Sequence, residues 1–308
     1  MNNIFVNLKR FEVSRTLGGV CDASSPREWT ETVMEEAVRL GLGQMPDTRV
    51  VFLLPEALLI TAVSRLGQFP PDQTANLSIG CQGVHREDIA VGGNFGAFTS
   101  VLPATAAVAI GCEWAIIGHS EERKNMQGII GHYAGKYANP GPEDISGSVN
   151  ELLNQEVLRA LRAGLKVLYC VGETAEEKGS GTLQEQELRV KELLGKQLDV
   201  GLNGAARQMT AGNIVIGYEP IWAIGPGKTP PDSTYIGFVS AFIKAEMMKL
   251  YGLEAAVVYG GGLKEENAGT IAAVPSIDGG LVALTRFSGD IGFYPGDLRK
   301  IVDNYRRQ

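Results

Sequence analysis

The chain of 308 residues is 44% hydrophobic and 20% charged, so it is long enough and apolar enough to bury a large core. Its formal net charge of −7 argues against nucleic acid or an acidic membrane surface as the main partner. Residues 1–9 lack the basic start and the long apolar segment of a secretion signal, and no run approaches the roughly 20 apolar residues of a membrane span. We therefore expect a cytoplasmic protein.

The first helix is predicted to begin after Ser25, which can cap it, because Pro26 suits a first turn and Glu28 lies three residues after the cap. Apolar runs typical of buried parallel strands lie at residues 4–8, 50–54, 77–82, 114–119, 166–171, 213–218, 255–259 and 280–284. The other helix-like segments lie at residues 56–66, 103–111, 149–163, 183–200, 234–251, 265–273 and 296–306. Eight strand–helix units predict an α/β fold, a single (β/α)8 barrel domain over residues 1–308, with an open doubly wound sheet as the alternative.

Several of the segments that follow the strands are long, and in a barrel these segments form the catalytic face. They are residues 11–24, 83–100, 124–148 and 285–295. Residues 138–143 and 287–292 have the composition of loops. We therefore predict enlarged βα loops, which serve either a reshaped mouth of the barrel or contacts between subunits.

The most informative segment, residues 213–228, predicts a buried strand, then a carboxylate, then a mobile lid. Glu219 follows the apolar strand at its C-terminal end, where α/β proteins place their chemistry. Residues 222–224 form an apolar tip suited to excluding water, and Gly225, Pro226 and Gly227 resemble a hinge. A carboxylate that a lid desolvates is a stronger base toward a carbon acid.

Two other strand ends carry groups that complement this carboxylate. Asn7 and Lys9 close the first strand, and a lysine there can hold an anionic substrate and stabilise developing negative charge. His119 ends the fourth strand, and Ser120 opens the next helical segment. A helix N-terminus disfavours the cationic imidazole, which suits a neutral hydrogen-bond donor. Taken singly, Lys9 could be a solvated lysine and His119 a structural histidine; together with Glu219 they predict proton abstraction next to a carbonyl.

These motifs resemble the triosephosphate isomerase family. The matching stretches, in order, are Asn7-Leu8-Lys9, Gly96-Ala97-Phe98-Thr99, Gly111 to Trp114, Gly118-His119-Ser120-Glu121, Cys170 to Thr174, Tyr218 to Lys228, and Tyr259-Gly260-Gly261. They run from the first strand to the seventh and cover most of the chain. The resemblance implies that Lys9 and His119 are electrophiles, Glu219 is the base and Asn7 positions them, with Glu121 and Cys170 as supporting residues. It also implies a small phosphorylated sugar as substrate and a homodimer as the assembly.

The departures from the family pattern concentrate on phosphate binding. The resemblance implies that Gly225 and Gly262 contact phosphate, but Gly262 stands where the family has a serine. Ala283 and Leu284 stand where the family has a Gly-Gly pair, and a leucine side chain can obstruct the close approach of backbone to a ligand. Either Arg286 replaces the lost contacts, or the substrate differs, or the site has decayed; alternatively Arg286 forms a surface ion pair.

Other family positions also differ, since Glu122 precedes Arg123 where the family has arginine, and Ser100-Val101 replaces Gly-Glu in the third loop. These changes weaken the implied dimer contact.

No cofactor or metal is predicted. The four cysteines (Cys21, Cys81, Cys112, Cys170) lack C-x-x-C spacing, and the three histidines (His85, His119, His132) fall in different predicted elements. Gly227-Lys228-Thr229 resembles the end of a nucleotide-binding loop, but the required first glycine falls at Trp222. The leading hypothesis is a metal-free triosephosphate isomerase; the same enediol chemistry on another small sugar and a non-catalytic barrel are the alternatives.

Overall fold

A closed barrel of eight parallel strands, β1 to β8 in chain order, forms the centre of the computed structural model, which describes residues 1–137, 141–225 and 227–307. The strands are β1 (Asn2–Asn7), β2 (Thr48–Leu54), β3 (Leu77–Cys81), β4 (Trp114–Ile117), β5 (Lys166–Glu173), β6 (Ile214–Pro220), β7 (Ala256–Tyr259) and β8 (Gly279–Val282). Strand β8 pairs with β1 in parallel, which closes the barrel. The predicted barrel is therefore confirmed, and the open sheet is excluded.

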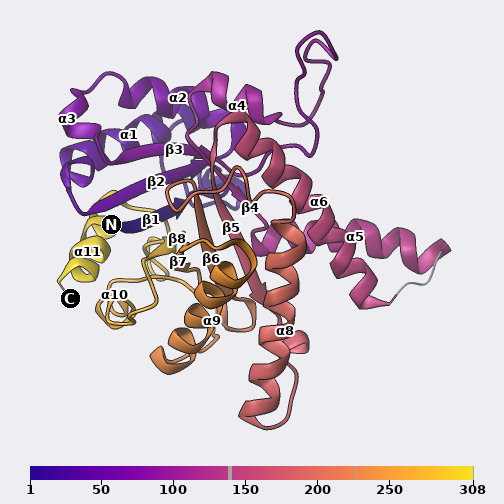
Figure 1. The fold of residues 1–308 in the computed structure, drawn as a ribbon. Coiled ribbons are helices and arrows are strands. Elements are labelled where there is room, and N and C mark those ends of the chain that lie inside the picture. Colours follow the sequence, from indigo (N-terminus) through magenta and orange to yellow (C-terminus); the bar gives the residue numbers. More distant parts are fainter. Residues whose placement is uncertain (138–140, 226, 308) are drawn as a thin grey trace.

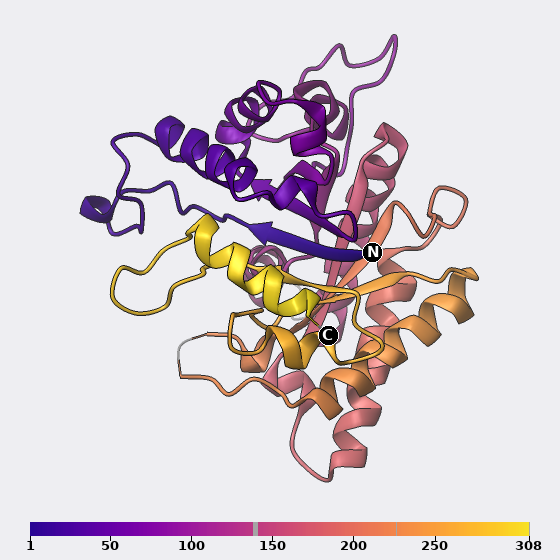
Figure 2. The same ribbon diagram turned by 90° about the vertical axis from the view of Figure 1, so that its left-hand side faces the viewer.

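Helices surround the strands (Figures 1 and 2). They are α1 (Pro26–Arg39), α2 (Glu56–Leu66), α3 (Pro71–Thr74), α4 (Ala104–Ile110), α5 (Ser120–Tyr137), α6 (Pro142–Ala163), α7 (Ala175–Lys178), α8 (Leu183–Gly201), α9 (Ser233–Tyr251), α10 (Ala268–Ala272) and α11 (Pro295–Arg306). Three short 3-10 turns, η1 (Arg15–Leu17), η2 (Leu42–Gln44) and η3 (Ile221–Ala223), lie between them. Ser25 caps α1 by accepting a hydrogen bond from the N–H of Glu28, as the sequence predicts.

The prediction of a loop over residues 124–148 is wrong, because α5 runs to Tyr137 and α6 begins at Pro142. Residues 138–140, part of the predicted loop at 138–143, lie outside the described residues. The glycines and prolines of this stretch suggested a loop, but Gly128 and Gly135 face open space on α5, where an isolated glycine is tolerated. Pro142 occupies the first turn of α6, where its missing N–H costs nothing. Helix α5 reaches beyond the outline of the barrel in Figure 1.

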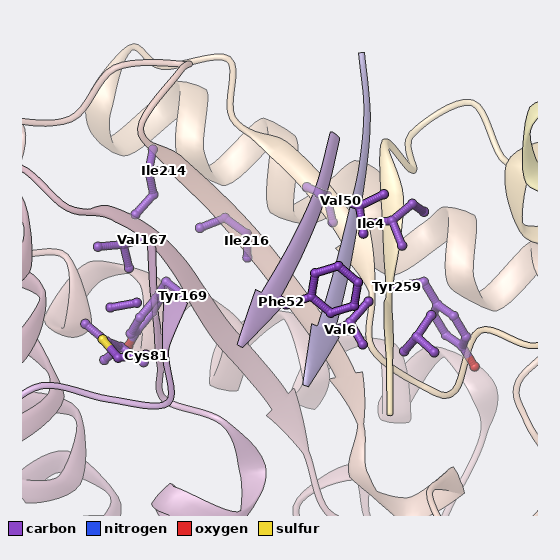
Figure 3. Packing of buried hydrophobic residues seen from close by; sticks show 14 of the residues in the cluster. Ile4, Val6, Val50, Phe52, Cys81, Val167, Tyr169, Ile214, Ile216 and Tyr259 are labelled. Carbon is purple, nitrogen blue, oxygen red and sulfur yellow. The ribbon is translucent and has the colours of Figure 1, made fainter. Parts of the chain in front are cut away.

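Alternate residues of the strands build two apolar layers, because side chains on a strand point to opposite faces. The inner layer contains strand residues only, and in it Phe5 and Trp114 pack edge to face with ring centroids 5.0 Å apart. The outer layer joins strand residues such as Ile4, Phe52 and Ile216 to apolar residues of the surrounding helices. Figure 3 labels some of the strand residues of this layer. The two layers fix the strands, so residues just beyond the strand ends are held on a rigid frame.

Closure of the barrel requires a glycine at residue 279. Gly279 has a φ of +151°, and a Cβ there would lie 1.9 Å from the carbonyl oxygen of Asn3 on β1. Only a residue without a side chain allows the last strand to approach the first this closely.

We expect Gly279→Ala to lower the free energy of unfolding by about 2–5 kcal/mol, since the new methyl group adds steric overlap to backbone strain. Gly147→Ala in α6 is the matched control, because a Cβ there meets nothing within 4 Å. The control should gain about 0.5–1 kcal/mol from helix propensity. Urea unfolding measures both, and equal midpoints for the two variants would contradict this account of closure.

Within residues 1–137, 141–225 and 227–307, none of the helices combines the length and the apolar character needed to cross a bilayer.

Candidate active site

The residues that the sequence singles out gather at one end of the barrel. Asn7 ends β1, His119 follows β4, Glu219 lies in β6, Gly262 follows β7 and Ala283 follows β8. All eight strands are parallel, so their C-terminal ends meet at the same mouth.

Lys9 is held in a strained backbone turn after β1. Its φ is +43°, a left-handed conformation that is uncommon outside glycine. The Asn7 side-chain oxygen accepts hydrogen bonds from the N–H of Lys9 (3.1 Å) and from the Gln82 amide nitrogen (3.0 Å). The Gln82 amide also donates to the Lys9 and Leu53 carbonyls, each at 3.2 Å. Asn7 is thus hydrogen-bonded to the turn, and Gln82, which the sequence reasoning missed, joins the turn to β2 and β3.

The Lys9 ammonium forms an ion pair with Glu121 in the first turn of α5, with Nζ 2.7 Å from Oε1. Burial alone would raise the pKa of the Glu121 carboxyl, but the hydrogen bond and charge of Lys9 outweigh it, and the pKa lies below its usual value. The pair joins the loop after β1 to the loop after β4. Glu121, for which the resemblance implies a supporting role, is thus the ion-pair partner of Lys9.

His119 stands between β4 and α5 with a defined tautomer. The N–H of Glu121 donates to His119 Nδ1 at 3.3 Å, so in the neutral ring the proton resides on Nε2. That Nε2 lies 3.3 Å from Glu219 Oε1, and the His119 side chain is 13% exposed. The ring therefore presents an N–H donor toward the mouth of the barrel.

Glu219 is 3% exposed and held by the start of α5. Its Oε2 accepts from the Ser120 N–H and its Oε1 from the Ser120 hydroxyl, both at 2.9 Å. The N-terminus of a helix favours a negative charge at this place. Close approach of neighbouring strands also confines the residue, since a Cβ on Gly260 would lie 2.8 Å from Glu219 Cγ.

Arg123 locks the turn that carries His119. Its guanidinium is 6% exposed and donates to the Gly118 carbonyl (2.8 Å), the Cys170 carbonyl (2.9 Å) and the Asn150 side chain (2.7 Å). These bonds join the loop after β4 to β5 and α6. Sequence reasoning missed this role, although Arg123 lies next to the matched Gly118–Glu121 motif.

The predicted lid is anchored through Glu173 at the end of β5. One oxygen of this fully buried carboxylate accepts from the Trp222 indole (2.8 Å) and from the Tyr218 (2.9 Å) and Tyr235 (3.1 Å) hydroxyls. Burial raises the pKa of Glu173 in spite of these three donors. The Lys178 ammonium lies 3.6 Å from the centroid of the Trp222 ring. Trp222, near the beginning of the lid, is thus hydrogen-bonded to Glu173 of β5.

The predicted far hinge includes two glycines with positive φ, +119° at Gly225 and +75° at Gly227, and neither would meet another atom through a Cβ. Pro226 lies outside the described residues. A positive φ favours glycine at both positions, and the space around them is open.

Cys170 lies inside the barrel, fully buried, and a Cβ on Gly217 would stand 3.0 Å from its sulfur. Burial, followed by the charge of Glu219, raises the pKa of the thiol well above its usual value. The thiol is therefore neutral and fills space beside the glutamate.

The expected phosphate end contains Gly262, with a φ of +91°, and residues 283 and 284, which follow β8 directly. The Arg286 side chain forms an ion pair between its own loop and helix α11. Its guanidinium bonds Asp297 with nitrogen–oxygen distances of 2.8 and 3.2 Å and stacks 4.0 Å over the Tyr294 ring. The structure favours the ion-pair reading of Arg286.

The described part of the chain contains no group of three or more His, Cys, Asp or Glu side chains placed to hold a metal ion.

A family model described as triosephosphate isomerase matches residues 27–290. The chain belongs to this family. The triosephosphate isomerase of Nitratidesulfovibrio vulgaris is 30% identical over 264 residues, 84% of this chain and 89% of that protein, and that of Pelodictyon phaeoclathratiforme is 35% identical over 201 residues, 64% and 68%. The crystal structure of triosephosphate isomerase from Bartonella henselae superposes with a TM-score of 0.67 at 25% identity and covers 99% of both chains.

One departure from the family pattern forms a buried acid pair beneath the histidine turn. Glu122 Oε2 accepts from the Gly118 N–H at 2.6 Å, and its carboxyl group is hydrogen-bonded to that of Glu156 on α6. Glu156 is 6% exposed. Burial, then the charge of Glu122, raises the pKa of Glu156 to about 10, against the smaller opposing charge of Arg86. Burial also raises the pKa of Glu122, although the hydrogen bonds with Glu156 and with the Gly118 N–H oppose it.

The pair should make stability depend on pH. Between pH 4.5, the usual pKa, and about 10 the folded chain keeps a proton that the unfolded chain releases. The free energy of unfolding should therefore fall as pH rises, by up to about 1.4 kcal/mol per unit. Glu156→Gln, whose amide can donate to Glu122 without titrating, should remove this part of the slope.

Chemical unfolding at pH 6 and pH 9 measures the effect. We expect Glu156→Gln to gain stability relative to wild type as pH rises, whereas Glu151→Gln, an exposed residue on the same helix, should follow the wild-type profile. Parallel profiles for wild type and Glu156→Gln would refute the shared proton.

Proposed function

We propose that this protein interconverts dihydroxyacetone phosphate and glyceraldehyde 3-phosphate through an enediolate, with Glu219 as the base and Lys9 and His119 as electrophiles. The observation that carries the proposal is the meeting of Glu219 with the Nε2 of His119 at 3.3 Å, beside the Lys9–Glu121 pair. A base, a neutral donor and a fixed cation at one mouth are what proton abstraction next to a carbonyl requires.

The reaction begins when a substrate enters between these three side chains. Glu219 exchanges one of its hydrogen bonds from Ser120 for contact with the substrate and removes a proton from the carbon that bears the hydroxyl group. The electron pair moves to the carbonyl oxygen, where the His119 Nε2–H and the Lys9 ammonium stabilise the negative charge. His119 gives its Nε2 proton to this oxygen and takes the proton of the neighbouring hydroxyl group, which becomes the new carbonyl. The protonated Glu219 returns a proton to the neighbouring carbon, which yields the isomer.

The lid and the phosphate end hold the reacting molecule. Closure of residues 221–227 over the mouth would exclude water and protect the enediolate from side reactions. Asn7 positions Lys9, and Gly225, Gly262, Ala283 and Leu284 are the proposed contacts of the phosphate group. Glu121 and Cys170 support the electrophiles and the base.

We also propose that residues 1–308 form one domain, because the first and last strands pair with each other. A cytoplasmic location and a homodimer agree with the family. The segment between β3 and α4 supports the dimer, since it projects from the barrel in Figure 1 and exposes Val91 and Phe95, 109% and 89% accessible. Two apolar side chains exposed on one projecting loop offer a surface that a second subunit can cover.

The base can be tested with Glu219→Gln, which keeps the shape of the side chain and removes its basicity. We expect turnover of glyceraldehyde 3-phosphate in a coupled assay to fall by about a hundredfold to ten-thousandfold, the usual contribution of a general base. Glu192→Gln on α8, where the side chain is 71% exposed, is the control and should match wild type. Wild-type rates in Glu219→Gln would remove this residue from the mechanism.

If wild type itself does not convert either triose phosphate, the assay should be repeated with longer and unphosphorylated ketoses. Turnover of one of these would favour the same enediol chemistry on another sugar, and inactivity on all of them would favour a non-catalytic barrel.

The dimer can be tested by light scattering. We expect a mass twice that of the 33.0 kDa chain for wild type and a shift toward monomer for the double substitution Val91→Ser and Phe95→Ser. The exposed Leu188 on α8 provides the control, because Leu188→Ser should leave the mass unchanged. A monomeric wild-type chain would rule out the proposed assembly.

A further inference from the structure

Lys264 provides a positive charge near the expected phosphate end and has no carboxylate partner in the described part of the chain. It lies after β7, two residues beyond Gly262, and its Nζ stands 4.2 Å from the centroid of the Phe287 ring in the loop after β8. Among residues 1–137, 141–225 and 227–307, no Asp or Glu oxygen lies within 4.0 Å of this ammonium, although Glu265 and Glu266 follow it in the chain.

The side chain of Lys264 runs alongside Gly262. A Cβ built on Gly262 would lie 4.0 Å from Lys264 Cε, so the lysine stem borders the space into which a side chain at residue 262 would project. Asn267 fixes this arrangement, since its amide donates to the Gly262 carbonyl at 3.0 Å and its oxygen accepts from the Lys264 N–H at 2.8 Å.

The same loop lies directly against the proposed base. Gly260, four residues before Lys264, is so close to Glu219 that a Cβ there would meet Glu219 Cγ at 2.8 Å. A ligand held at the Gly262–Lys264 turn would therefore have its other end near the carboxylate. Phe287 limits the directions that the ammonium can take, because a cation over an aromatic face is held by the ring quadrupole.

Arg286, the other nearby cation, is already neutralised. It bonds Asp297 through two nitrogens. Residues after β8 therefore supply an aromatic ring and a bulky Leu284, but the positive charge of Arg286 is already paired with Asp297.

We propose that Lys264 binds the phosphate group of the substrate and sets the preference of this chain for phosphorylated sugars. The inference rests on the proposed function for the location of the phosphate end. An ammonium binds phosphate as a compact charge with rotatable donors. Lys264 can therefore bind the phosphate group without the close approach of backbone N–H groups that the Leu284 side chain hinders.

The test compares wild type, Lys264→Met and Lys264→Arg. Loss of a charge-assisted hydrogen bond should raise the KM for glyceraldehyde 3-phosphate, and the inhibition constant of inorganic phosphate, by about tenfold to a hundredfold in Lys264→Met. The specificity for unphosphorylated glyceraldehyde should stay at the wild-type value. Lys264→Arg keeps the charge and should recover most of the affinity.

Lys191→Met is the matched control, because the Lys191 ammonium also lies over an aromatic ring, 4.9 Å from the centroid of Phe238, on the outer helices α8 and α9. It should bind substrate and phosphate as wild type does. An unchanged KM in an active Lys264→Met enzyme, or an equal loss with unphosphorylated glyceraldehyde, would overturn the role of Lys264.

The two proposals fail in different ways. A wild-type chain that rejects triose phosphates but converts another sugar phosphate, with a Lys264-dependent KM, would contradict the proposed substrate and support the phosphate role. An active wild type that is indifferent to Lys264→Met would do the reverse.

Discussion

The two hydrogen bonds that Ser120 donates to Glu219 determine the geometry of the site. They place a buried carboxylate at the positive end of α5, where the helix dipole favours its charge. Because His119 precedes Ser120, the same helix start brings the imidazole to 3.3 Å from that carboxylate. The proposed base and the proposed hydrogen-bond donor thus share one anchor, and Glu121 in the next position is paired with Lys9.

This anchor must be rigid in its backbone and labile in its side-chain bonds. Arg123 supplies rigidity because its guanidinium donates to both the Gly118 carbonyl and the Cys170 carbonyl of β5. Glu122, which is paired with Glu156, accepts a hydrogen bond from the Gly118 N–H. Lability follows from the chemistry, since Glu219 can act on a carbon only when one oxygen leaves Ser120. In the proposed mechanism, closure of the lid would exclude water at that step, so that the carboxylate contacts the substrate and not solvent.

The barrel and its strand-end residues could be predicted from the sequence, because apolar runs, caps and glycine hinges are local signals. Contacts between distant segments could not. Gln82 reaches Asn7 across 75 positions, and the pairing of Glu122 with Glu156 depends on how α6 packs. The prediction of a loop over residues 124–148 was wrong because glycine and proline composition does not reveal that α5 and α6 occupy most of this stretch. The sequence left open whether Arg286 binds phosphate or forms an ion pair, because its partner Asp297 lies eleven residues away on another element.

The central claim is that Glu219 carries a proton between two carbons of the substrate, and proton NMR of dihydroxyacetone phosphate conversion in deuterium oxide tests it most directly. A carboxylic acid exchanges its proton with solvent, so the account predicts that wild-type turnover places deuterium on the carbons that Glu219 serves, and that Glu219→Gln places none at a comparable rate. Labelling by Glu219→Gln at the wild-type rate would assign the base to another residue and would contradict the account.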